Sequence, residues 1–385
     1  MAKKYKRRKK QVRLTKNQAI ALAIFLLIVI VVGAFLYKKG YIQFGDDSLS
    51  ASQNGPAIQT DELSIHFPML GNKNSGDCTL IKTGNTEVLI DAGSTRGSAA
   101  TIVPYIKQYC TDGVLEYVIA THAHEDHIAA FVGSSTSSTD GVFENFVCDT
   151  IIDFPLHNTN SGIYNDYVQL RDAENAKHYT ALECWNAGVN GENAVKEGAR
   201  RQFVLDEGIT LNILYHKFYE TKTSDENDYS VCVLLTQGNK NYLFTGDLEG
   251  AGEKSLVANN SLPEVELFKA GHHGSPTSSS AELLDIIKPK NVVVCCCCGN
   301  HKEYNFSSMD VVFPSQQFVT NVAKWTENVY VTTLYDEEND SFLPMNGNIV
   351  FTSDGLVLNL WCSENKTKFK DTEWFSKNRV WNTGP

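Results

Sequence analysis

Apolar positions recur along the chain in two patterns, which predict strands and helices in alternation. The expected strands are Leu63–Met69, Cys78–Lys82, Glu87–Ile90, Tyr117–Ala120, Val147–Ile152, Ile209–Leu214, Val231–Thr236, Tyr242–Thr245, Leu267–Ala270, Val292–Cys297, Val329–Thr333 and the stretch Asn348–Leu360. The expected helices are Ala99–Cys110, Tyr164–Gly188, Ala251–Ala258 and Ser279–Ile287. Two strand-rich halves with helices outside predict one α/β (α+β) domain built of layers.

The longest apolar run lies near the N-terminus. Ala19–Tyr37 contains 19 residues without a charge, which is enough to cross a hydrocarbon core of about 30 Å as one helix. Nine Lys or Arg residues lie within residues 1–16, so the N-terminus is expected in the cytoplasm and the chain from Gly40 onward outside. A cleaved signal peptide is the alternative, but the run is longer than is usual for one.

These patterns divide the chain into five segments. They are a basic cytoplasmic tail (1–18), a transmembrane helix (19–37), a linker (38–61), one globular domain (62–362) and a C-terminal tail (363–385). The linker is rich in Gly, Ser, Asp and Asn, which is typical of a flexible tether. The expected location is therefore the cell membrane, with a single span and an extracellular domain.

Four potential metal ligands follow the strand expected to end at Ala120. They are His122, His124, Asp126 and His127. Imidazole and carboxylate suit a catalytic Zn²⁺ or Mn²⁺ that keeps an open coordination position. In a tight loop, alternating side chains can turn toward two neighbouring ions, with His122 and His124 at one and Asp126 and His127 at the other. A loop that is His-rich by chance is the alternative.

Two later strand ends supply further candidates. One apolar run ends at Thr245 and is followed by Asp247, and another ends at Ala270 and is followed by His272 and His273. A strand-end carboxylate can bridge two cations, so Asp247 is the expected bridging ligand. One or both histidines complete the set, but the sequence does not indicate which one binds which ion.

Together these motifs resemble the metallo-β-lactamase superfamily, and within it the ComEC/Rec2-type hydrolase domain of competence proteins. The matching stretches, which span roughly Leu63 to Val357, are Gly76-Asp77-Cys78, Val88-Leu89-Ile90-Asp91-Ala92-Gly93, Thr121-His122-Ala123-His124-Glu125-Asp126-His127, Leu243-Phe244-Thr245-Gly246-Asp247-Leu248-Glu249 and Lys269-Ala270-Gly271-His272-His273-Gly274-Ser275. The resemblance implies a four-layer αββα sandwich with two divalent metal ions, Zn²⁺ or Mn²⁺, at one edge.

The resemblance also implies roles for particular carboxylates. A hydroxide that bridges the two metals would attack phosphorus or a carbonyl carbon, with Asp126 and Asp247 as the catalytic carboxylates. Asp91 would support the ligand loop by hydrogen bonding, although a simple turn with Ala92-Gly93 is an equal alternative.

The chain departs from the family in two places. Residues 226–230 lack the additional metal-binding histidine of many members, so an oxygen of Asp228 is the expected substitute. ComEC-like domains have Gly-His-Pro where this chain has Tyr304-Asn305-Phe306. The weak candidates for substrate binding are Ser275, Thr277 and His301.

Charge limits the choice of substrate. The first 39 residues hold 11 of the 34 basic residues and none of the 45 acidic ones, so the remainder is strongly acidic and repels a polyanion on average. The chain after residue 39 has no Lys/Arg cluster of the kind that nucleic-acid-binding proteins usually show. This weakens the prediction of a nuclease without removing it.

The favoured function is a membrane-anchored extracellular metal-dependent phosphodiesterase or nuclease, with DNA as one candidate substrate and DNA uptake as its setting. A hydrolase of a choline-phosphate ester, a lactone or a β-lactam is the alternative, and a non-catalytic surface binding module is a third. One membrane span cannot form a channel, so uptake would need a separate membrane transport partner.

Overall fold

The computed structural model describes residues 56, 62–134, 136 and 138–382. The predicted transmembrane helix at residues 19–37 and the predicted linker, except for Pro56, lie outside this part of the chain. Within the described part, no helix has both the length and the apolar character that a membrane span requires. The predicted anchor therefore stays a prediction.

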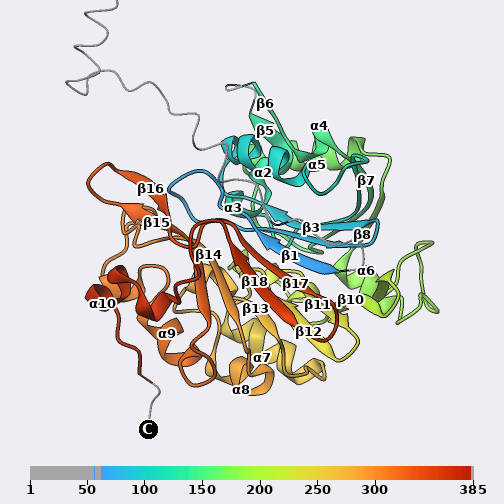
Figure 1. The fold of residues 1–385 in the computed structure, drawn as a ribbon. Coiled ribbons are helices and arrows are strands. Elements are labelled where there is room, and N and C mark those ends of the chain that lie inside the picture. Colours follow the sequence, from blue (N-terminus) through green and yellow to red (C-terminus); the bar gives the residue numbers. More distant parts are fainter. Residues whose placement is uncertain (1–55, 57–61, 135, 137, 383–385) are drawn as a thin grey trace, which may run out of the picture. The chain divides into compact units, whose positions relative to one another are not determined.

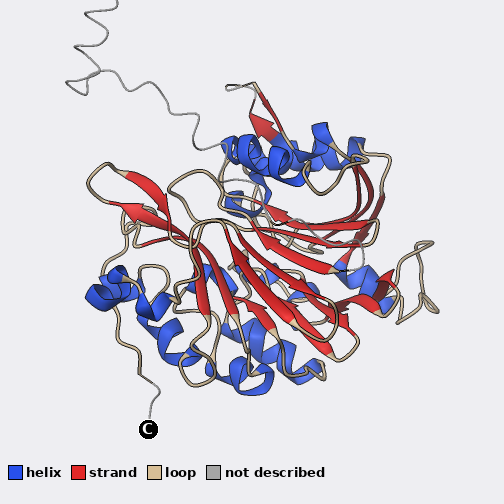
Figure 2. Ribbon diagram, in the orientation of Figure 1, coloured by secondary structure: helices blue, strands red, loops and turns tan. Residues whose placement is uncertain are grey.

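Two eight-stranded sheets form the centre of the domain (Figure 2). The first sheet has, in spatial order, the strands β18 (Leu358–Cys362), β17 (Ile349–Ser353), β1 (Leu63–Phe67), β2 (Cys78–Thr83), β3 (Thr86–Ala92), β4 (Val114–Ile119), β7 (Val147–Asp153) and β8 (Lys177–Thr180). The second sheet has β16 (Ser341–Pro344), β15 (Val329–Asp336), β14 (Val292–Cys298), β13 (Leu267–Lys269), β12 (Lys240–Phe244), β11 (Cys232–Gln237), β10 (Ile209–Leu214) and β9 (Gln202–Asp206). A small hairpin joins β5 (Gly133–Ser134) and β6 (Thr139–Asp140).

Helices cover the outer faces of both sheets (Figure 1). The first sheet is covered by α2 (Ala99–Ile106), α3 (Glu125–Val132), α4 (Val142–Asn145) and α5 (Gly162–Ala173), and the second by α7 (Gly250–Asn259), α8 (Ala281–Ile287) and α9 (Gln316–Val322). The remaining helices are α6 (Ala181–Asn186) and α10 (Glu373–Asn378). The order helix, sheet, sheet, helix is the predicted four-layer αββα sandwich.

Strand β14 shows how the second sheet contributes to two cores. Val293 and Cys295 belong to the core shared with the first sheet, whereas Val292, Cys296 and Cys298 pack with the helices on the outer face. Successive side chains of a strand point to opposite faces. A run of small apolar residues therefore suits a strand that is covered on both sides, and these cysteines are buried and free of disulfides.

The predicted helix Tyr164–Gly188 is wrong in its extent. The structure divides this stretch into α5, strand β8 and α6. Strand β8 pairs in parallel with β7, and the hydroxyl of Thr180 at its end accepts a hydrogen bond from the Glu183 amide to begin α6. Pairing with a neighbouring strand thus outweighs the local preference of the segment for helix.

The predicted ligand loop is partly helical. His124 is the N-cap residue of α3, and Glu125 and Asp126 lie in its first turn. Acidic side chains are favourable there, because the backbone N–H groups at a helix N-terminus carry partial positive charge. The loop prediction is therefore corrected for Asp126 and His127, which are fixed by a helix.

Parallel strands in both sheets end at the same edge of the sandwich. Strands β3, β4, β7 and β8 are parallel in the first sheet, and β12, β13, β14 and β15 are parallel in the second. Connections that leave the carboxyl ends of such strands are the usual position of functional residues in α/β proteins. The segments that follow β4, β12, β13 and β14 contain the candidate site.

The C-terminal tail packs against the second half of the domain. Phe369 and Phe375 are buried within the core beside the outer helices. The guanidinium of Arg379 donates hydrogen bonds of 2.8 Å to the carbonyl oxygens of Val312 and Pro314. These contacts fix the segment that follows β14.

Candidate metal centre

The first half of the domain supplies the histidine-rich segment after β4. Its backbone is held in place by the backbone amide of Asp77, which donates a 3.0 Å hydrogen bond to the carbonyl oxygen of Asp126. Gly93 permits this approach, since a Cβ at that position would lie 1.5 Å from the same carbonyl oxygen. The segment therefore needs glycine at this contact.

The second half supplies Asp247 after β12 and the pair His272 and His273 after β13. Both histidines have positive φ angles, 47° and 54°, in a backbone region that non-glycine residues rarely occupy. Asp91, at the end of β3, has a φ of 59°. Such backbone strain gathers at functional sites, where the surrounding structure holds it in place.

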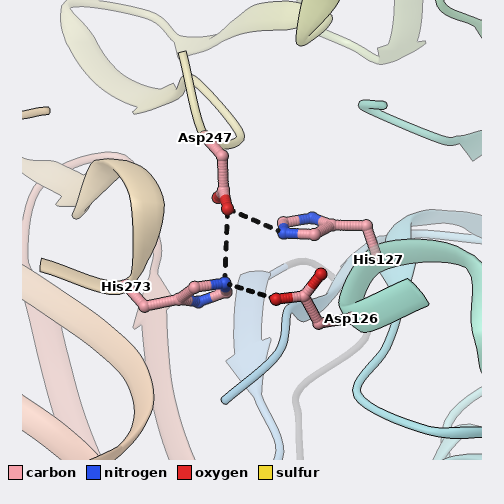
Figure 3. A group of neighbouring side chains, drawn as sticks. All are labelled: Asp126, His127, Asp247 and His273. Atoms are coloured by element: carbon pink, nitrogen blue, oxygen red, sulfur yellow. Dashed lines mark ion pairs between the residues drawn. The ribbon is translucent and has the colours of Figure 1, made fainter. Parts of the chain in front are cut away.

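Four side chains from the two halves converge on one point (Figure 3). Asp126, His127, Asp247 and His273 each offer a ligand atom, and these atoms lie within 4.8 Å of one another. The Oδ2 atom of Asp247 is 3.1 Å from Nε2 of His127 and 3.3 Å from Nε2 of His273. His273 Nε2 is also 3.3 Å from Oδ2 of Asp126. We call these four residues the inner cluster.

Buried groups hold the far side of each inner imidazole. Nδ1 of His127 lies 2.8 Å from Oδ2 of Asp91, and Asp91 also accepts hydrogen bonds of 2.7 Å from the amide and hydroxyl of Thr121. Nδ1 of His273 lies 2.8 Å from the carbonyl oxygen of Cys295 and 3.2 Å from Oδ1 of Asp77. Such partners orient metal-binding imidazoles and fix their tautomer.

Asp77 has a second partner, the buried ammonium group of Lys269 in β13. The two side chains form an ion pair and are 5% and 3% exposed. Lys269 Nζ also lies 3.8 Å from Oδ1 of Asp247. Sequence reasoning assigned no role to either residue, although both lie in stretches that match the family motif.

The other three predicted histidines lie around the inner cluster. Nε2 of His122 is 3.0 Å from Nδ1 of His124, and the rings of His122 and His127 have centroids 4.1 Å apart. His272 is partly exposed, with Nε2 4.0 Å from Oδ2 of Asp247. Its Nδ1 faces the Thr277 hydroxyl at 3.2 Å and Oε1 of Glu249 at 3.4 Å.

Electrostatics within the cluster favour ionised carboxylates. Burial alone would raise the pKa of Asp126 and Asp247, but the neighbouring imidazoles outweigh it and lower both pKa values. Burial likewise opposes protonation of His127 and His273, and the surrounding carboxylates raise the pKa of both imidazoles above the usual value. A bound cation would displace these protons and take over the interaction with the carboxylates.

The inner cluster fits a divalent cation by its free donor atoms. Nε2 of His127, Nε2 of His273 and Oδ1 of Asp247 are buried and have no hydrogen-bond partner among the described residues. Buried polar atoms are nearly always satisfied, so several unsatisfied polar atoms at one point indicate a site that suits a cation. Mixed imidazole and carboxylate donors suit Zn²⁺ or Mn²⁺.

A polar cleft of about 600 Å³ opens over this cluster. Its wall includes His124, Asp126, Asp247 and His272 from the predicted site. Glu125, Glu303 and Tyr304 add two carboxylates and a phenol, and none of the described lining residues is Lys or Arg. The cleft is thus acidic before any cation binds.

None of the three predicted substrate-binding residues lines this cleft. Ser275 and Thr277 are engaged with each other at 2.9 Å, and Thr277 donates to Glu249 at 2.8 Å. His301 faces Glu337, with 3.8 Å between Nδ1 and Oε1. Asp228, the predicted oxygen ligand, is buried, and burial together with the neighbouring carboxylates of Asp225 and Glu249 raises its pKa to about 6.

The fold and the strand-end cluster define a class of metal-dependent hydrolase. Residues 71–133 and 221–298 match the metallo-beta-lactamase superfamily. Over these ranges the chain is similar to this superfamily, and it resembles the superfamily's competence-protein members. The two matched ranges contain all seven predicted ligands.

Among curated proteins, the chain is similar to competence protein ComA of Neisseria gonorrhoeae, with 26% identity over 63% of this chain and 28% of that protein. It is also similar to recombination protein 2 of Haemophilus influenzae, with 28% identity over 70% of this chain and 28% of that protein. The chain thus spans about 28% of the length of these relatives. Among solved structures, it is similar to the metallo-beta-lactamase fold protein YhfI from Bacillus subtilis, with 11% identity, coverage of 75% and 99% of the two chains and a TM-score of 0.39.

Proposed function

We propose that the chain is a membrane-anchored, extracellular phosphodiesterase or nuclease with two divalent metal ions. The observation that carries this proposal is the position of Asp247. Its Oδ2 atom lies within 4.0 Å of Nε2 of His127, His272 and His273. A carboxylate surrounded by imidazoles in this way is suited to bridge two cations.

The ligand set then divides around Asp247. His122 and His124 would hold one ion, and Asp126 and His127, with His272 or His273 or both, would hold the other. Bound Zn²⁺ or Mn²⁺ would supply Lewis-acid activation of water and stabilisation of negative charge on the substrate oxygens. Asp126, which lines the cleft, can accept a hydrogen bond from the attacking water and so fix its direction.

The setting of the reaction is proposed from the sequence and the relatives. The uncharged segment 19–37 would anchor the chain, with the basic residues before it in the cytoplasm. Two relatives are named as a competence protein and a recombination protein, which supports DNA as a substrate and DNA uptake as the process. A separate membrane protein would then provide the channel.

A second candidate function rests on the charge of the cleft. Four of its lining residues are acidic, namely Glu125, Asp126, Asp247 and Glu303, and none of those described is basic. Proteins that bind a nucleic-acid backbone neutralise phosphates with Lys and Arg. A hydrolase of a small neutral or cationic ester, such as a choline-phosphate ester, is therefore the alternative. A lactone or a β-lactam is a further alternative substrate.

Hydrolysis by the full chain in detergent, loaded with Mn²⁺ or Zn²⁺, tests both candidates. The substrates are labelled single- and double-stranded DNA, bis(p-nitrophenyl) phosphate, p-nitrophenyl phosphorylcholine, a lactone and a β-lactam. Metal-dependent cleavage of DNA is expected, together with a loss of at least about 10³-fold in Asp247→Asn, because a two-metal centre depends on its bridging carboxylate. Asp285→Asn on the exposed face of α8 is the matched control.

The outcomes separate the candidates. Cleavage of the choline ester without cleavage of DNA would replace the nuclease by the second candidate. A chain that binds two metal ions and cleaves no substrate in the panel would contradict both. Equal activity of Asp247→Asn and Asp285→Asn would show that the cleavage arises elsewhere.

A further inference from the structure

Tyr304 brings a hydroxyl group to the candidate metal centre from a third strand end. It follows β14, the neighbour of the strand that precedes His272 and His273. Its hydroxyl donates a 3.0 Å hydrogen bond to Oδ2 of Asp126. The same oxygen lies 3.3 Å from Nε2 of His273, so the phenol touches the inner cluster directly.

The loop that bears Tyr304 is tied to both halves of the domain. The carboxylate of Glu303 accepts hydrogen bonds from the amide and the hydroxyl of Ser75 in the first half. The side-chain amide of Asn300 donates a 2.7 Å hydrogen bond to the carbonyl oxygen of Lys73. These anchors place the phenol by contacts that are independent of Asp126.

Aromatic packing fixes the ring as well. The centroid of the Tyr304 ring lies 5.5 Å from that of Phe306 and 5.4 Å from that of Phe313. Both distances are within the usual range for aromatic pairs. Phe313 in turn lies 5.6 Å from the His272 ring and 6.0 Å from the His273 ring. The phenol therefore belongs to a packed wall of the cleft.

The hydroxyl end of this wall remains accessible to a ligand. Tyr304 is 44% exposed and lines the cleft beside Asp126 and Asp247. A phenolic hydroxyl can turn its proton toward a new acceptor by rotation about one bond. Because no described Lys or Arg lines the cleft, a phenol is well suited to supply a donor to a substrate oxygen.

We infer that Tyr304 binds the substrate: its hydroxyl turns from Asp126 to an oxygen of the phosphoryl group on which negative charge develops. This inference rests on the proposed phosphodiesterase function. Donors aimed at developing negative charge contribute most in the transition state. A purely structural role, in which Tyr304 only holds Asp126 in place, is the competing explanation and makes different predictions for metal binding.

The test compares Tyr304→Phe with Tyr335→Phe in the full chain. Tyr335 is a matched control, because its hydroxyl donates to the carboxylate of Asp340 at 2.5 Å and the residue does not line the cleft. Four quantities are measured: Mn²⁺ affinity and affinity for inorganic phosphate, both by calorimetry, and the kcat and KM for bis(p-nitrophenyl) phosphate.

For Tyr304→Phe, kcat is expected to fall by about 10- to 100-fold, somewhat less than for loss of an oxyanion-hole donor. Phosphate affinity of the Mn²⁺-loaded protein should fall about tenfold, as for one lost hydrogen bond. Mn²⁺ affinity should stay within about twofold, and Tyr335→Phe should leave all four quantities unchanged.

Other results would overturn the inference. Weakened Mn²⁺ binding in Tyr304→Phe that accounts for the lost activity would indicate the structural role. Unchanged phosphate affinity and unchanged kcat would exclude contact with the substrate. If the wild type binds Mn²⁺ but cleaves no phosphodiester, the proposed function fails, and phosphate affinity alone still decides whether Tyr304 contacts a phosphoryl oxygen.

Discussion

The inner and outer imidazoles of the candidate metal centre differ in how the protein holds them. His127 and His273 are fully buried, and each has Nδ1 beside a buried acceptor, Asp91 for one and the Cys295 carbonyl for the other. His124 and His272 lie at the cleft and are partly exposed. Their ring nitrogens face a second imidazole or an exposed hydroxyl.

This difference indicates that the fold orients the inner imidazoles, whereas the cation would orient the outer ones. The inner imidazoles are oriented before any cation binds, since their partners are themselves fixed by the fold. The outer imidazoles have weaker supports and would be ordered largely by the cation. We therefore expect substitutions of inner supports to affect stability and metal affinity strongly, and substitutions of outer supports to affect them weakly.

The largest effect is expected at the buried ion pair of Asp77 and Lys269. Asp77→Asn would leave the Lys269 ammonium buried without its partner, which typically costs about 3–5 kcal/mol. Urea unfolding of the chain in EDTA measures this loss without a contribution from bound metal. The double variant Asp77→Asn/Lys269→Met removes both charges and should recover most of the stability.

Failure of that recovery would contradict the explanation by an unpaired charge. It would show instead that the carboxylate of Asp77 stabilises the fold through His273, whose Nδ1 lies 3.2 Å away. A loss below about 1 kcal/mol in the single variant, as for an exposed ion pair, would remove the distinction between inner and outer supports at this position.

A smaller effect is expected for Asp91→Asn, which weakens the support of His127. Loss of such a carboxylate partner usually costs 10- to 100-fold in metal affinity, about 1.4–2.7 kcal/mol. Competition with a chromophoric chelator measures the affinity for Zn²⁺. Asp153→Asn is the matched control, because Asp153 is also buried at a strand end and lies 2.9 Å from an imidazole, that of His178, outside the cluster.

Equal losses of affinity in the two variants would mean that the effect is a general consequence of removing a buried carboxylate. An unchanged affinity in Asp91→Asn would favour the simple turn that the sequence left open for Asp91. We expect the loss in Asp91→Asn alone, since of these two carboxylates only Asp91 touches a member of the inner cluster, with a 2.8 Å contact to His127.

The inner ligands were predictable from sequence, and the family resemblance implied the support Asp91, but the supports Asp77 and Lys269 were not predicted. His127 and Asp126 stand in a dense motif directly after an apolar run, and Asp247 and His273 each follow another such run. Strand ends are visible as changes in apolar pattern. The partners Asp77 and Lys269 meet only because their strands belong to facing sheets, and no local pattern carries that information.

The stretch Tyr164–Gly188 shows the same limit. The aromatic and polar residues from Tyr164 onward were compatible with one long helix. Strand β8 forms there because β7 offers a free edge for parallel pairing, a tertiary effect that overrides propensity. Tyr304 was noticed only as a departure from a family motif, since its contact with Asp126 depends on loop geometry.

The smallest effect is expected at an outer support, for Thr277→Val. The Thr277 hydroxyl lies 3.2 Å from Nδ1 of His272 and donates to Glu249. His272 and Glu249 are both partly exposed. One hydrogen bond at such a position is worth about 0.5–1.5 kcal/mol, which corresponds to about 2- to 12-fold in metal affinity. Because water can replace the hydroxyl near His272, we expect the lower end of that range.

The same chelator competition measures this change, with Thr236→Val as the matched control, since the Thr236 hydroxyl donates to Asn241 near the start of β12, at the opposite end of that strand from Asp247. A loss in Thr277→Val as large as that in Asp91→Asn would show that His272 is held as firmly as His127. In that case the outer imidazoles would also be oriented before cations bind, and the proposed difference between inner and outer imidazoles would not hold.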